Sequence, residues 1–410
     1  MPTSTTPGVY WQDVFVPPPP PFMTGIPAFL GYAAGTGRPD EDHFDEPQLL
    51  TLWTHFEQLY GPPASSGYLA HAVRGFFEND GLMCYVVRLQ EAPVAPDRAL
   101  AAGLEALTAL DAIDLVCAPD IMRDAIKADA QVLTSVTEMQ KMVLTHCQQM
   151  GDRFAILDSL NTTVLATSPA PGKVATDEKQ ASIQEQRAQL QSPYGALYCP
   201  WLLAPIRDGS PVSVPPCGHV AGIYSRTDQQ TGVHKAPANE PIEGVLDLRY
   251  ALAEAEAGLL NEMGVNSLRA FPGRGVRVWG ARTLGDDRNP LGNYVNVRRL
   301  LITVSRWLER FMNAVTFEAN DTRLWLRIMR EVSAYCEALF RQGALKGRTA
   351  AEAFYVKCDS ETNPSAVIDA GMVVTEVGLA PIAPSEFIVV RIVHGESGVS
   401  IQPVGADSRQ

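Results

Sequence analysis

Residues 321–345 read DTRLWLRIMREVSAYCEALFRQGAL and have the periodicity of a long amphipathic helix. At 100° per residue, the apolar side chains fall on one broad face, which comprises Leu324, Trp325, Ile328, Met329, Val332, Tyr335, Cys336, Leu339 and Phe340. A narrow stripe on the opposite face comprises Arg323, Arg327, Arg330, Ala334, Glu337 and Arg341. The pattern predicts a helix that buries its apolar side and leaves its arginine-lined side available for contact with another molecule.

The arginine stripe has two interpretations: a solvated face whose arginines pair with nearby acids, or a protein interface. Glu337 is the one acid within the stripe, so pairs within the helix cannot neutralise it. Arginine also suits carboxylate contacts at interfaces, because its guanidinium is planar and permanently charged. Residues 298–348 hold ten Lys and Arg against five Asp and Glu, in a chain whose net charge is −13. We favour an interface with an acidic partner.

Length and composition indicate a folded chain of two or three domains, with 410 residues of which 46% are hydrophobic and 19% charged. The net charge of −13 argues against general nucleic-acid binding. No run of about 18 apolar residues predicts a membrane span, and the N-terminus lacks the pattern of a signal peptide. The seven cysteines form no C-x-x-C pair, and their odd number favours reduced thiols in a protein made in the cytoplasm.

No catalytic, cofactor-binding or metal-binding constellation stands out. The segment Gly273-Arg274-Gly275 has neither the dinucleotide-binding nor the P-loop spacing, so a tight turn is favoured. The pairs Cys217/His219 and His146/Cys147 lack a second Cys/His pair at zinc spacing. The sequence therefore predicts a protein that is not an enzyme and that has no cofactor and no metal.

Strand and helix patterns alternate over residues 24–158, which predicts an α/β layer with a largely parallel sheet. From Tyr294 onward, the pattern predicts helices over 296–315 and 321–345, then strands over 353–358, 371–379, 386–393 and 397–404. Elsewhere it predicts helices over 46–60, 68–79, 130–150 and 246–263, a strand over 196–203, and irregular chain over 208–217 and 227–241. Residues 285–293, rich in Gly, Asp and Asn, are the predicted domain boundary.

Both ends of the chain have the composition of strands. Residues Val9–Val16 are β-prone, and the five prolines Pro17–Pro21 hold the following stretch extended, so that the strand cannot fold back tightly. Two interpretations stay open for this arm: it pairs with the sheet edge of another chain, or it packs on its own subunit. At the other end, residues 397–404 form a short strand with a polar tail.

Twelve stretches, taken together, resemble the sheath proteins of contractile phage tails and related contractile injection systems. In chain order they are TPGVY (6–10), TGIPAFLG (24–31), GHVAGIY (218–224), GVHKAPAN (232–239), NEMGVN (261–266), PGRG (272–275), VWGART (278–283), YVNVRRL (294–300), FEAND (317–321), GALKG (343–347), AFYVKCD (353–359) and APSEFI (383–388). The resemblance spans nearly the whole chain. The proline run and the lack of a large outer insertion make the chain more similar to extracellular, phage-derived injection systems than to a long-tailed phage.

The resemblance implies a mixed α/β and α+β fold with an α/β outer domain (23–288) and a C-terminal helix-and-sheet domain that faces an inner tube (289–395). It also implies linking arms at 1–22 and 396–410. Family sheaths polymerise from a baseplate as stacked hexameric rings around the tube, then contract irreversibly and drive the tube into a target membrane. The implied location is a phage tail or phage-tail-like particle.

The implied partners are further copies of the chain or paralogous sheath subunits, the inner tube protein, and the baseplate and terminator proteins. Neither direct nucleic-acid binding nor membrane insertion is implied. The arms are expected to add strands to sheets of neighbouring subunits. The expected linking-strand residues are Val9, Tyr10, Trp11, Val14, Phe15, Val16, Phe387, Ile388, Val389, Val390, Val399 and Ile401.

The expected inner-tube contact is the arginine stripe, namely Arg323, Arg327, Arg330 and Arg341. The alternative function, from a different class, is a soluble α/β enzyme or ligand-binding protein with an oligomerising tail. That alternative predicts a discrete small oligomer and a polar pocket.

Overall fold

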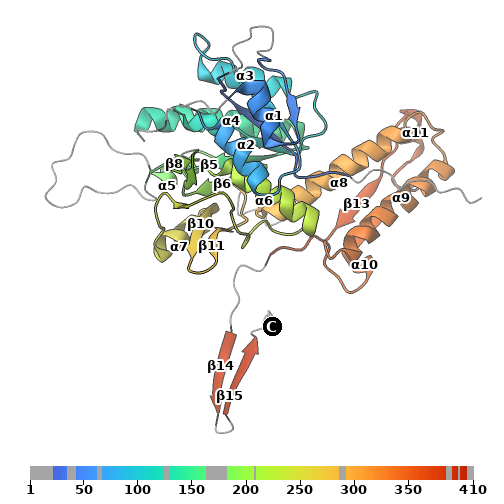
Figure 1. Cartoon of the computed structure of the whole chain (residues 1–410). Helices are drawn as coiled ribbons and strands as arrows, with labels where there is room; N and C mark the ends of the chain where they lie inside the picture. Colours follow the sequence, from blue (N-terminus) through green and yellow to red (C-terminus); the bar gives the residue numbers. More distant parts are fainter. Residues whose placement is uncertain are drawn as a thin grey trace, which may run out of the picture.

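The computed structural model describes residues 22–34, 43–61, 67–123, 125, 129–162, 182–206, 209–285, 292–384, 390–395 and 398–403. These residues form a sheet unit flanked by helices and a smaller C-terminal unit built on two long helices (Figure 1). The predicted mixed α/β fold is confirmed. No helix in the described ranges is long and apolar enough to cross a membrane.

An eight-stranded sheet forms the centre of the larger unit, with the strand order β11-β10-β6-β5-β4-β1-β3-β2. The strands are β1 (Pro27–Gly31), β2 (Gln48–Leu50), β3 (Cys84–Arg88), β4 (Leu115–Cys117), β5 (Phe154–Asp158), β6 (Gly195–Cys199), β10 (Val265–Phe271) and β11 (Gly275–Trp279). The six inner strands pair in parallel, and the edge strands β2 and β11 pair antiparallel. The largely parallel sheet predicted from the alternation of elements is therefore confirmed.

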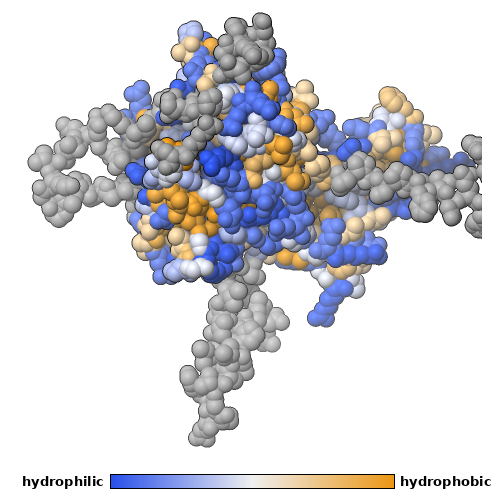
Figure 2. Space-filling model, viewed as in Figure 1, coloured by the Kyte–Doolittle hydropathy of each residue, from blue (hydrophilic) through white to orange (hydrophobic). Residues whose placement is uncertain are grey.

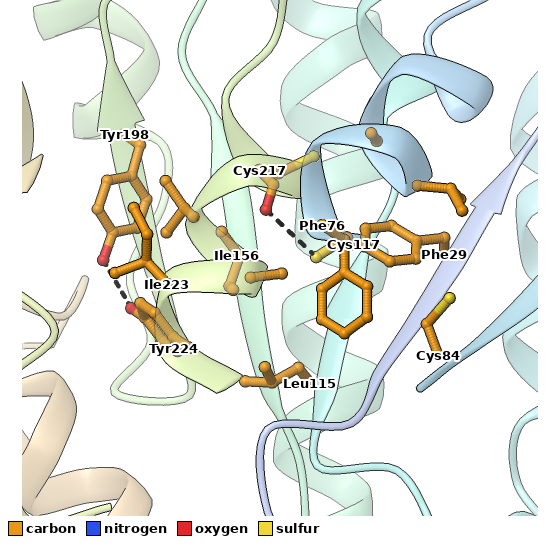
Figure 3. Packing of buried hydrophobic residues seen from close by; sticks show 14 of the residues in the cluster. Phe29, Phe76, Cys84, Leu115, Cys117, Ile156, Tyr198, Cys217, Ile223 and Tyr224 are labelled. Atoms are coloured by element: carbon orange, nitrogen blue, oxygen red, sulfur yellow. Dashed lines mark hydrogen bonds between the residues drawn. The ribbon is translucent and has the colours of Figure 1, made fainter. Parts of the chain in front are cut away.

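Helices cover both faces of this sheet, because its strands are apolar on both sides. The helices are α1 (Trp53–Tyr60), α2 (Leu69–Glu78), α3 (Pro96–Ala106), the 3-10 helix η2 (Pro119–Met122), α4 (Ala130–Met150), α5 (Ile183–Ala188), α6 (Cys217–Gln230) and α7 (Glu254–Glu262). Along β1, Leu30 packs into the core under α3 and α4, whereas Phe29 points into the opposite core under α1, α2 and α6. Figure 3 shows the second core, where Phe29 and Phe76 meet edge to face.

Helix α6 corrects the prediction of irregular chain from residue 227, because residues 217–230 are helical. Close packing on α2 fixes this helix. A Cβ at Gly218 would lie 2.2 Å from the carbonyl oxygen of Ala72, and a Cβ at Gly222 would lie 2.6 Å from that of Phe76. Glycines at these positions let the two helix backbones approach more closely than any other residue would allow.

Three further segments differ from the prediction. The helix predicted from residue 46 begins only at Trp53, because residues 48–50 form the edge strand β2 and extend the sheet instead. The helix predicted from residue 246 begins at Glu254. The strand predicted over 196–203 is divided between β6 and β7, and β7 (Leu202–Pro205), β8 (Pro211–Val214) and β9 (Asp247–Leu248) form a small separate sheet.

The C-terminal unit is built on the helices α8 (Val295–Ala314) and α9 (Thr322–Arg341). Its shorter elements are α10 (Ala350–Ala353), β12 (Phe354–Lys357), α11 (Ser365–Asp369) and β13 (Glu376–Leu379). Helix α8 joins both units, because Val295 and Ile302 lie in the sheet-unit core while Trp307 stacks on Tyr335 of α9 with 3.9 Å between ring centroids. Helix α8 therefore packs in both units and connects them, as its course in Figure 1 illustrates.

The predicted apolar face of α9 is confirmed. Leu324, Trp325, Ile328, Val332, Cys336 and Leu339 are buried, and Met329, Tyr335 and Phe340 are half-buried. Asp321 begins the helix by accepting hydrogen bonds from the backbone N–H groups of Arg323 (2.8 Å) and Leu324 (3.1 Å). After this unit, β14 (Val390–Gly395) and β15 (Gly398–Pro403) pair antiparallel with each other.

Candidate functional site

The arginine stripe lies on the solvent-facing side of α9, as predicted. Arg323, Arg327, Arg330 and Arg341 are all exposed. The stripe therefore remains available for contact with another molecule. Its assignment to the inner tube stays a prediction.

Ion pairs on the stripe are more numerous than the helical spacing predicts. Arg341 pairs with Glu337 within the helix at 2.5 Å. Arg330 contacts its neighbour Glu331 at 2.8 Å, and Arg327 contacts Glu318 at 2.6 Å. Glu318 precedes the helix in the chain, so a count along α9 misses it. The Arg330 and Arg341 side chains stay 74% and 76% exposed, and such pairs contribute about 0–1 kcal/mol each.

A buried charge cluster, which sequence reasoning missed, fixes α8 to the sheet unit. Arg299 donates to both carboxylate oxygens of Asp228, at 2.9 and 2.6 Å, and to Asp114 at 3.0 Å. All three side chains are at most 3% exposed. Burial alone would lower the pKa of Arg299, but the two carboxylates outweigh burial and raise the pKa above its ordinary value.

The same cluster holds the first described residues of the chain. Asp114 accepts hydrogen bonds from the backbone N–H groups of Gly25 (3.0 Å) and Ile26 (2.6 Å). About two turns further along the same face of α8, the Arg306 guanidinium lies over the Phe22 ring, 5.2 Å from its centroid. Residues 22–26 are thus fixed both to the sheet unit, through Asp114, and to α8, through Arg306.

A sequence signal for part of this cluster exists. Arg299 and Arg306 are seven residues apart, on the same face of α8 as Val295 and Ile302, so two arginines interrupt an otherwise apolar face. Nothing in the sequence indicates their partners, because Asp114 lies 185 residues before Arg299.

Most of the predicted linking-strand residues lie outside the described part of the chain. This holds for Val9, Tyr10, Trp11, Val14, Phe15, Val16, Phe387, Ile388 and Val389. Within the described hairpin, Val390 is opposite Pro403, Val399 is opposite His394, and Ile401 is opposite Ile392. Their role in linking subunits stays a prediction.

In open α/β sheets, ligands commonly bind in the crevice beyond the strand ends where the chain reverses direction across the sheet. Here that point lies between β1 and β4, since the strands that follow β1 are placed on both of its sides. The Asp120 carboxylate lies at this point and accepts hydrogen bonds from the backbone N–H groups of Tyr32 (2.7 Å) and Tyr68 (2.5 Å), beside a cavity of about 320 Å³ that Tyr32, Asp120 and Arg123 help to line. Burial raises the pKa of Asp120 to about 6, although these bonds and Arg123 act in the opposite direction.

No group of three or more His, Cys, Asp or Glu side chains in the described ranges is placed to hold a metal ion. The seven cysteines are all free and buried. The features that stand out in the described ranges are the exposed arginine stripe and the buried cluster of Arg299, Asp114 and Asp228.

Comparison with known families identifies the class of protein to which this chain belongs. A family model for the phage tail sheath protein central domain matches residues 98–284, and a model for the phage tail sheath C-terminal domain matches residues 287–394. The chain belongs to the phage tail sheath family.

Curated relatives agree with this assignment. The chain is 28% identical over 183 residues to the tail sheath protein of Vibrio phage KVP40, a match that covers 44% of this chain and 26% of that protein. It is 26% identical over 171 residues to the tail sheath protein of Salmonella phage ViI, covering 41% of this chain and 26% of that protein. The matches thus span about a quarter of the length of these two relatives.

Solved structures match over almost the whole chain. A chain in the anti-feeding prophage baseplate structure superposes with a TM-score of 0.73 and 27% identity, covering 96% of this chain and 99% of that one. A chain in the PVC sheath complex, an extracellular contractile injection system in its contracted state, gives a TM-score of 0.71 and 26% identity with the same coverage. Among known structures, the fold is thus that of a contractile sheath subunit.

Proposed function

We propose that this chain is a sheath subunit of a phage-tail-derived contractile injection system. Copies polymerise from a baseplate into a six-fold helical sheath around an inner tube and then contract, which drives the tube through a target membrane. The observation that carries the proposal is the likeness, over 96% of the chain, to a chain of the PVC sheath complex in its contracted state.

Sheet addition is the proposed link between subunits. The N-terminal strand 9–16 and the C-terminal segment around β15 pair with sheets of neighbouring copies through main-chain hydrogen bonds. Each bond contributes only about 0.5–1.5 kcal/mol net, but a helical lattice repeats the contact at every subunit. The anchoring of Gly25 and Ile26 by Asp114 supports this role, because a pull on the N-terminal arm is then transmitted to the α8 junction.

The arginine stripe is the proposed contact with the inner tube. Its arginines are exposed and weakly paired, so they can exchange their present acids for those of a partner. Individually weak ion pairs suit a surface that releases the tube when the sheath widens. Further partners are the baseplate, the terminator and paralogous sheath subunits, and the subunit is made in the cytoplasm.

The sheath proposal leaves no catalytic role for the chain. The alternative of an α/β enzyme or ligand-binding protein finds no support, since the family models and the solved structures that match this chain are those of sheath proteins.

Electron microscopy of the purified full-length protein tests the proposal. We expect rings or tubes, and a population of small compact oligomers alone would contradict it. A variant that lacks residues 1–16 keeps the described fold, so it is expected to stay folded and to form no sheath. Sheaths of normal length from this variant would remove the linking role of the N-terminal arm while leaving the sheath assignment intact.

A further inference from the structure

The turn between α8 and α9 presents a phenylalanine to solvent in an unusual backbone conformation. Phe317 is fully exposed, at 103% of its reference area, and its φ is +70°. The other non-glycine residues with positive φ in the described ranges are His, Asp or Asn, which tolerate this region. For a bulky aromatic residue the conformation is strained, and such strain is retained mainly where function requires it.

Contacts of Glu318 and Asn320, which follow Phe317, hold the turn in place. The Asn320 side chain donates to the carbonyl oxygen of Met372 at 2.9 Å and accepts from the indole N–H of Trp325 at 2.9 Å. Glu318 forms its 2.6 Å ion pair with Arg327. The phenylalanine ring is therefore presented by a fixed turn.

The surface around the turn combines apolar and basic side chains. Met372, Val374 and Leu326 are 52%, 43% and 57% exposed. Figure 2 shows hydrophobic surface at this end of the C-terminal unit, near α11. The Glu318–Arg327 pair connects the turn to the arginine stripe. Phenylalanine, methionine and arginine are among the residues that are enriched in protein interfaces.

The turn lies at the other end of α8 from Asn296 and beyond Arg306, the residues of this helix that contact Ile382 and Phe22. Asn296, in the first turn of α8, donates to the carbonyl oxygen of Ile382 at 3.2 Å, just before the segment that leads to β14. Phe22 contacts Arg306, near the middle of α8. The 20-residue helix α8 spans about 30 Å, so the Phe317 turn is at its free end. The links between copies that we propose at the chain ends therefore leave this surface free for a different partner.

We propose that Phe317 is the apolar anchor by which the subunit docks on the inner tube, inserting into an apolar pocket with an acidic rim. The inference rests on the proposed sheath function and deepens it. The basic stripe beside Phe317 selects an acidic partner surface, while insertion of the ring fixes the position of the subunit along the tube. Loss of the ring is expected to weaken docking roughly 10- to 100-fold, the effect of one buried aromatic side chain.

Phe317→Gly separates a docking role from a structural one. Glycine adopts a positive φ without strain, so the variant is expected to melt at the same temperature as the wild type or higher. Tubes assembled from the inner-tube protein of the same particle are the probe. The concentration of full-length subunit needed for half-maximal decoration is measured by co-sedimentation and electron microscopy.

We expect Phe317→Gly to require at least 10-fold more subunit, Phe317→Leu to recover part of the loss, and Leu82→Gly to behave as the wild type. Leu82 is a matched control, since it is 50% exposed and lies in the turn before β3. The inference would be overturned if Phe317→Gly decorated tubes at the same concentration as the wild type. It would also be overturned if that variant failed to polymerise in the absence of the tube, because Phe317 would then lie between copies of the subunit. If the wild-type chain forms neither sheath nor decorated tubes, the proposed function itself fails.

Discussion

Removal of the Arg299 guanidinium is expected to destabilise the subunit severely. In Arg299→Met, Asp228 loses both of its hydrogen bonds from Arg299, and Asp114 loses one. The two carboxylates are only 2–3% exposed, so the variant leaves two buried negative charges without a cation. Breaking a buried ion pair in this way costs about 3–5 kcal/mol.

Urea unfolding of the full-length subunit, followed by tryptophan fluorescence at pH 7.5, measures this cost. Arg310→Met is the matched control, because Arg310 is exposed on the same helix and the substitution removes the same charge. The control is expected to change the free energy of unfolding by less than about 0.5 kcal/mol.

The effect of Arg299→Met also has a pH signature. In the wild type, burial raises the pKa of Asp228 while Arg299 lowers it. Without the cation only the raising effect of burial remains, so the pKa of Asp228 rises further and the folded variant takes up a proton at higher pH than the wild type does. Its deficit relative to the wild type should therefore shrink between pH 7 and pH 5, and Asp228→Asn added to Arg299→Met should recover part of it. A deficit below about 1 kcal/mol, or one that does not change with pH, would refute the reasoning.

Three further predictions concern the sheet unit and α9. Gly222→Ala should destabilise the fold by about 1–3 kcal/mol, since its Cβ would lie 2.6 Å from the Phe76 carbonyl oxygen, whereas Gly258→Ala, in open space on α7, should be neutral or stabilising in the same urea titration. Burial raises the pKa of Asp158 to about 7, so the folded state binds its proton more tightly. As the pH rises from 5 to 7, the free energy of unfolding of the wild type should therefore fall by roughly 1 kcal/mol per pH unit relative to that of Asp158→Asn. Melting temperatures that change with pH in the same way for both proteins would exclude this. Asp321→Ala should cost about 0.5–2 kcal/mol through loss of the helix cap, and an unchanged urea midpoint would show that the cap contributes nothing.

Periodicity was sufficient where one helix face is buried along its whole length. The α9 face from Leu324 to Phe340 follows from spacing alone, because the apolar side chains along it all pack into one or the other of the two core clusters of the C-terminal unit. The strands of the parallel sheet follow from short apolar runs for the same reason, since both of their faces are buried.

Prediction failed where a local preference was weaker than a distant contact. Residues 48–50 fit the same helical periodicity as the segment that begins at Trp53. They nevertheless form a strand, because they pair with the otherwise unpaired edge of β3. Helix α6 packs on α2 through Gly218 and Gly222. The need for glycine at these positions is visible only when the two helices are in contact. Ion pairing on the arginine stripe was underestimated, because Glu318 reaches Arg327 from outside the helix.

The sequence by itself determined the family resemblance, the apolar and basic faces of α9 and the largely parallel sheet, because each of these is encoded in neighbouring residues. Only the tertiary structure decided that Arg299 joins Asp114 and Asp228, and that Phe317 stands exposed with a positive φ at the free end of α8. The physical reason is that burial and charge pairing depend on which distant segments come into contact, and the spacing of residues along the chain does not determine those contacts.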